Sequence, residues 1–144
     1  MSKMEQALSC MEEGFSCSQS IFSTFAADFG IDRETALKIA SSFGGGMACT
    51  AETCGAVTGA FMVLGLKYGR TVGKDEETKQ RNYDFVLEFI KRFRDKHGSI
   101  CCRELLGHDI STTEGRERMK EEGLFETLCR DLVRSSVEIL EILL

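Results

Sequence analysis

Seven cysteines give this chain its clearest capacity for redox or metal chemistry. Cys17, Cys54 and the pair Cys101–Cys102 each stand where the sequence predicts that a helix begins. A thiol in a first helical turn faces the positive end of the helix dipole, which favours the thiolate, the form that reacts and binds metals. If these helix starts converge, they would hold several thiolates in one electropositive pocket. Such a pocket suits iron–sulfur ligation or a dithiol of low pKa.

Cys54 lies in an unusual stretch, which opens with the three glycines Gly44–Gly46 and also contains Cys49. With Thr53 as the predicted N-cap, Cys54 is expected to be the most acidic thiol of the metal-free chain, below the ordinary thiol pKa of about 8.5. Gly55 and Gly59 share one face of the following helix, where a cofactor or another backbone could come close. Plain helix packing is the alternative for this pair.

Several common sites are excluded by the spacing of the motifs. No Cys-x-x-Cys pair is present, so the pattern is not that of a zinc finger. The glycine triplet lacks the Gly-Lys-Ser/Thr of a phosphate loop, and the two histidines lack the partners of a catalytic triad. The remaining alternative for each cysteine is simple core packing, which fits Cys129 because it lies on an apolar helical stripe.

The cysteine-containing segments together resemble the C-GCAxxG-C-C family of redox-active proteins. The resemblance is carried by Cys54-Gly55-Ala56-x-x-Gly59, and it extends to Gly14–Gln19, Cys102–Gly107, and Cys129 with the apolar helix that follows. It therefore covers nearly the whole chain. The resemblance implies that Cys17, Cys54, Cys102 and Cys129 are the redox-active or metal-ligating thiols, with Gly55 and Gly59 beside any cofactor. Cys10, Cys49 and Cys101 are extra to the pattern, and Cys49 is a further candidate ligand.

The elements that must position these cysteines are predicted to be helices. Apolar residues recur at spacings of three and four along most of the chain, glycines separate the segments, and proline is absent. We predict an all-α fold in one domain, residues 1–144, with about six or seven helices. The helix from Cys54 to near Gly69 is rich in glycine and alanine and is expected to lie buried at the centre.

Composition narrows the classes of function. The net charge of −5 argues against a nucleic-acid-binding surface. No apolar run approaches the roughly 20 residues that a membrane span needs, and no signal peptide is visible, so we expect no membrane insertion and a cytoplasmic location. In that reducing compartment an odd number of cysteines is not expected to form a disulfide framework.

These observations leave two redox mechanisms and one non-catalytic alternative. In the first mechanism the four cysteines ligate an iron–sulfur cluster for electron transfer, which the resemblance favours because related domains occur joined to split-Soret cytochromes. In the second, two thiols cycle through a disulfide, with Cys54 attacking. The alternative is a helical interaction module, with or without a structural zinc. A redox partner protein is implied by the first two, and the sequence leaves open whether the chain forms a homo-oligomer.

Overall fold

Eight α-helices form the fold, described here from a computed structural model covering residues 1–144. This confirms the all-α class, although the expected number of six or seven helices was slightly low. Short 3₁₀ turns follow α2 and α3, and a π-helical turn, Phe125–Cys129, leads into α8. The helices are α1 (Lys3–Glu12), α2 (Cys17–Ala26), α3 (Arg33–Ala40), α4 (Gly55–Tyr68), α5 (Glu76–His97), α6 (Cys102–Leu106), α7 (Thr113–Glu121) and α8 (Arg130–Leu143).

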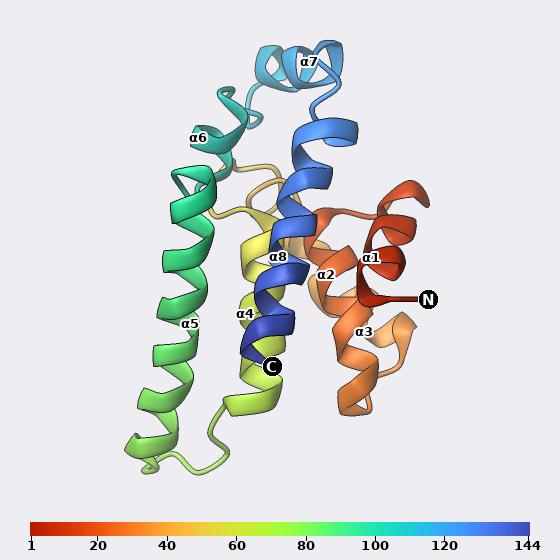
Figure 1. The fold of residues 1–144 in the computed structure, drawn as a ribbon. Helices are drawn as coiled ribbons and strands as arrows, with labels where there is room; N and C mark the ends of the chain where they lie inside the picture. The colour runs from red at the N-terminus through yellow and green to blue at the C-terminus, as the bar shows by residue number, and fades with distance from the viewer.

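Helix α4 is the centre of the molecule. It packs against α2, α5 and α8, and Figure 1 shows α5 on one side of it and α1–α3 on the other. Its buried residues extend around the helix rather than along one stripe, as expected of a helix enclosed on several sides. The hydroxyl of Ser136 on α8 donates to the carbonyl of Ala56 at 2.7 Å, which ties α8 to the start of α4. The predicted central, buried helix is therefore present.

Local sequence signals explain where the helices around the site begin and end. Ser16 and Gln19 form the predicted capping box, which places Cys17 at the first position of α2. Gly98 and Gly107 adopt left-handed conformations just after α5 and α6. The prediction for α4 was wrong by one residue, because Cys54 itself, and not Thr53, occupies the N-cap position. The thiol thus stands before the first helical turn and not within it.

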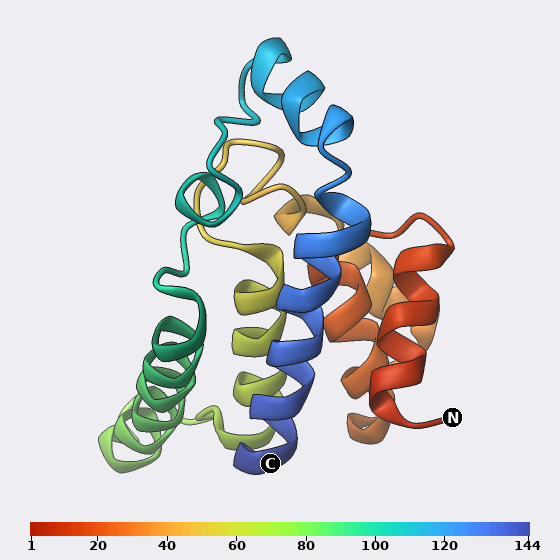
Figure 2. The same cartoon turned by 45° about the horizontal axis from the view of Figure 1, so that its top comes forward.

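The connections and the short helices gather at one end of the bundle. Figures 1 and 2 show α6, α7 and the connection before α4 above the ends of α4 and α8. A short antiparallel contact pairs Thr53 with Cys101. Around it, Cys54 N–H donates to the carbonyl of Ile100 at 2.8 Å, and Cys102 N–H donates to that of Glu52 at 2.6 Å. These bonds fix the start of α6 beside the start of α4. No helix is long and apolar enough to cross a membrane.

Replacing Gly59 by leucine should destabilise the fold, because Gly59 lies where α4 presses against α2. A Cβ atom there would stand 3.0 Å from the carbonyl oxygen of Ser18 and 3.1 Å from Cβ of Ile21. Overpacking of this kind costs about 1–3 kcal/mol of unfolding free energy. Gly65→Leu on the same helix is the matched control, since a Cβ there meets nothing within 4 Å. Equal denaturation midpoints for the two variants would contradict the close approach.

Candidate functional site

A cavity of about 330 Å³ lies where the helix starts converge. Five of the seven cysteines line it, and they come from four different segments of the chain: the start of α2, the connection before α4, the start of α6 and the π-helical turn before α8. The five are Cys17, Cys49, Cys54, Cys102 and Cys129. The set includes the four cysteines selected by the resemblance, together with Cys49. We call this space the cysteine cavity.

The other two cysteines do not line the cysteine cavity. Cys10 is buried between α1 and α2, where its sulfur lies 3.8 Å from the hydroxyl oxygen of Ser23. Cys101 turns away from its neighbour Cys102, and its thiol donates to the carbonyl of Ala51 at 3.5 Å. Consecutive side chains on a helix point about 100° apart, so only one of this pair can face the cavity.

The two glycines of the central helix have different surroundings. Gly55 lines the cysteine cavity, and a Cβ there would lie 2.9 Å from the backbone nitrogen of Ser18 and 3.3 Å from Cβ of Cys17. A side chain at this position would push against the start of α2. Gly59, one turn further on, contacts α2 and does not line the cavity.

Sequence reasoning missed the unusual backbone that forms one wall of the cavity. Gly45 and Gly46 are left-handed, and so are four non-glycine residues after them: Met47, Ala48, Cys49 and Ala51. Left-handed conformations cost such residues about 1–2 kcal/mol each. Hydrogen bonds offset part of that cost, including those from Ala51 N–H to Gly45 and from Glu52 N–H to Gly46. The glycine triplet was the only signal, and it marks where the segment begins but not how far it extends.

Apolar side chains from α6 to α8 complete the lining: Leu105, Leu106, Ile110, Met119, Phe125 and Leu132. Arg116, on α7, is the only charged residue among them. Its guanidinium donates to the carbonyl of Ile110 at 3.0 Å and to the hydroxyl of Thr113 at 3.3 Å. Periodicity placed these residues on helices, but only the folded chain shows that they face the thiols.

The thiols of Cys54 and Cys102 are held in the neutral form. Burial raises the pKa of Cys54 to about 12, although the backbone N–H groups of Ala56 and Val57 act in the opposite direction. Burial, followed by the charges of the surrounding thiols, raises the pKa of Cys102 to about 12 as well. The expectation that Cys54 is the most acidic thiol is therefore wrong for the metal-free protein, because removal from water outweighs the helix terminus.

Cys17 and Cys129 form a directly interacting pair. The interaction between their thiols raises the pKa of Cys17 and lowers the pKa of Cys129. Cys129 is the last residue of the π-helical turn, and its N–H donates to the carbonyl of Leu124 at 2.8 Å. Of these two thiols, the one with the lowered pKa is thus Cys129, which the sequence placed in an apolar helix interior.

We expect the metal-free protein to lose stability as the pH rises from 9 towards 12. In the unfolded chain Cys54 and Cys102 ionise near the ordinary pKa of 9.0, whereas in the fold they keep their protons until about 12. Between these values the unfolded state binds fewer protons, so the free energy of unfolding falls with pH. Denaturant unfolding of the wild type and of a Cys54→Ala/Cys102→Ala variant measures the effect. An equally steep fall in both proteins would contradict it.

The donor set of the cysteine cavity is chemically uniform. Its only ligand-type side chains are thiols, which bind soft metals and iron–sulfur clusters when deprotonated. No three His, Cys, Asp or Glu side chains converge on one point that could hold a single ion. The five thiols line the walls of one cavity. This all-thiol donor set suits a soft metal or an iron–sulfur cluster.

A comparison with protein families gives one match. The sequence profile described as "Putative redox-active protein (C_GCAxxG_C_C)" matches residues 15–143, which is nearly the whole chain and includes all five cavity cysteines. No curated protein and no solved structure shows significant similarity to the chain.

Proposed function

The chain belongs to the C_GCAxxG_C_C family of redox-active proteins, and we propose that its four family cysteines hold an iron–sulfur cluster that exchanges single electrons. The observation that carries the proposal is the convergence of Cys17, Cys54, Cys102 and Cys129 on one cavity of about 330 Å³. Cys₄ ligation is the usual mode for such clusters. Residues from four separate segments can meet in this way only after folding, so the fold itself builds the site.

The environment of the four thiols also supports this function. Buried thiols with raised pKa values need a partner that stabilises the thiolate, and the cavity lining provides one cation, Arg116, at its exposed rim. Iron supplies that stabilisation when it is bound, because coordinated thiols are deprotonated. The apolar lining excludes water, and cluster potentials depend on such burial and on hydrogen bonds to sulfur.

Protein residues perform three tasks in this proposal. The bonds from Cys54 N–H and Cys102 N–H to the opposing segment hold two thiols in fixed relative positions. The N–H groups of Ala56 and Val57, at the start of α4, favour negative charge on the Cys54 sulfur and act to lower its pKa. Gly46 allows the backbone to approach Cys102, where a Cβ would stand 2.8 Å from the cysteine Cβ. The cavity is thereby shaped before any cluster arrives.

The contact between Cys17 and Cys129 supports a second candidate function, a dithiol–disulfide couple. Cys129 has a lowered pKa and Cys17 adjoins it, so these two thiols are the pair best placed to oxidise. Formation of their disulfide would release two protons and two electrons to an oxidised partner, such as a protein disulfide. In this version Cys129 is the nucleophile, and not Cys54 as the sequence suggested.

Purification without oxygen tests the two candidates and the zinc-stabilised module together. For the cluster we expect iron and acid-labile sulfide in the protein, visible charge-transfer absorption that bleaches on reduction, and a paramagnetic resonance signal in one oxidation state. Iron-free protein that forms a reversible Cys17–Cys129 disulfide would favour the couple. Stoichiometric zinc, or a protein with neither metal nor disulfide, would favour the interaction module.

A further inference from the structure

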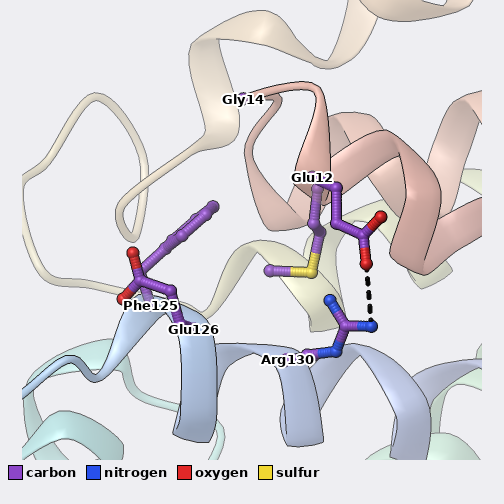
Figure 3. A pocket seen from close by; sticks show the side chains of 6 residues that line it. Glu12, Gly14, Phe125, Glu126 and Arg130 are labelled. Atoms are coloured by element: carbon purple, nitrogen blue, oxygen red, sulfur yellow. Dashed lines mark ion pairs between the residues drawn. The ribbon is translucent and has the colours of Figure 1, made fainter.

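A second hollow lies on the outside of the cysteine cavity, between the end of α1 and the start of α8. It has a volume of about 300 Å³ and is lined by Met11, Glu12, Gly14, Phe125, Glu126 and Arg130. Figure 3 shows the ion pair that crosses it, from Arg130 on α8 to Glu12 on α1, with a distance of 3.1 Å. We call this hollow the α1/α8 groove.

Phe125 lines both the α1/α8 groove and the cysteine cavity, and it is the only residue that does so. Its half-buried ring therefore stands at the boundary between the two hollows, and Figure 3 shows it on the groove side. Cys129 lies four residues later, at the end of the same π-helical turn, and also lines the cavity. π-Helical turns within helices occur frequently at functional sites. The turn thus places the aromatic side chain of Phe125 close to Cys129, the thiol whose pKa is lowered.

We propose that the α1/α8 groove is a second entrance to the cysteine cavity, with Phe125 as its gate. Small water-soluble reductants, oxidants or thiol reagents would pass through it to Cys129 and Cys17. Cys49, which is exposed at the rim on the other side, would react directly with solvent. The inference concerns access alone, so it stands whether the thiols hold a cluster or form a dithiol couple.

The surroundings of Phe125 leave room for the ring to move. The ring faces a hollow of about 300 Å³, to which Gly14 on the opposite side adds no side chain. A ring that rotates towards this space would open the wall without moving a helix, and side-chain rotations of this kind are fast. The groove also has a charge bias, because Glu12 and Glu126 outnumber Arg130. An anionic reagent should therefore enter more slowly than a neutral one of the same size.

The test follows alkylation of each cysteine in the full-length, reduced, metal-free chain by mass spectrometry. Phe125→Ala should accelerate labelling of Cys129 and Cys17 several-fold relative to Cys49. Leu124→Ala is the control, because Leu124 precedes the gate in sequence and lines neither hollow. Equal acceleration in both variants would indicate general loosening and would overturn the proposal. Phe125→Leu, a smaller perturbation, should give an intermediate acceleration if the alanine variant does not fold.

Charge identifies the route independently of Phe125. The ratio of iodoacetate to iodoacetamide rates at one cysteine cancels the thiolate fraction of that cysteine. Glu12→Lys should raise this ratio several-fold at Cys129 at low ionic strength. Glu13→Lys adds the same charge one residue away, outside the groove, and should leave the ratio nearly unchanged. If Arg116→Glu, and not Glu12→Lys, changes the ratio at Cys129, reagents enter beneath α7 and the proposal is wrong.

Discussion

Cys54→Ser is expected to abolish cluster binding while leaving the helical fold in place. Cys54 is the N-cap of the central helix, where the backbone N–H groups of Ala56 and Val57 favour its thiolate. Serine has nearly the same size, but its hydroxyl stays protonated and is a poor ligand for iron in a sulfur site. We therefore expect iron content and visible absorption to fall to background, with the far-ultraviolet circular dichroism spectrum unchanged.

Cys10→Ser is the matched control for this experiment. Cys10 is as buried as Cys54, but it lies between α1 and α2 and contacts Ser23 rather than the cysteine cavity. Its replacement should leave iron content intact. The reverse ranking, with iron lost from the Cys10 variant and retained in the Cys54 variant, would remove the basis for the proposed site. Cys49→Ser adds a further comparison, because Cys49 lines the cavity but is outside the family pattern.

Gly46→Ala should disrupt both the cysteine cavity and the stability of the chain. Gly46 is left-handed, with φ of 69°, and a Cβ there would stand 2.6 Å from the backbone nitrogen of Glu52. It would also press on Cys102 at 2.8 Å. The clash involves backbone and cannot be relieved by a rotamer change. We expect a loss of about 1–3 kcal/mol in unfolding free energy, as for other overpacked sites, together with reduced cluster occupancy.

Gly73→Ala provides the comparison for Gly46. Gly73 lies in the exposed connection before α5, and a Cβ there meets nothing within 4 Å. Its replacement should change neither the denaturation midpoint nor the iron content. If Gly46→Ala is equally harmless, the left-handed wall of the cavity can rearrange freely and does not constrain Cys102.

The sequence was sufficient to predict the helices and most of their ends, because these depend on local interactions. Spacings of three and four show which faces are buried, and Ser16 with Gln19 supplies a capping box that needs no distant partner. The four family cysteines could likewise be selected from the motif around Cys54 and the segments that accompany it. The N-cap of α4 was predicted one residue too early, at Thr53 instead of Cys54. The backbone at this point is held by the hydrogen bond from Cys54 N–H to Ile100, a partner distant in the sequence.

Only the tertiary structure decided how the cysteines behave and what surrounds them. The helix terminus favours ionisation of Cys54, but the depth of its burial depends on α2, α6 and α8 packing over it, and burial prevails. The interaction that lowers the pKa of Cys129 joins it to Cys17, more than a hundred positions away in the sequence. The left-handed segment that forms one wall of the cysteine cavity depends on long-range packing in the same way. So does the position of Phe125, which lines both hollows. Local periodicity does not encode such contacts, because each of them exists only when separate helices meet.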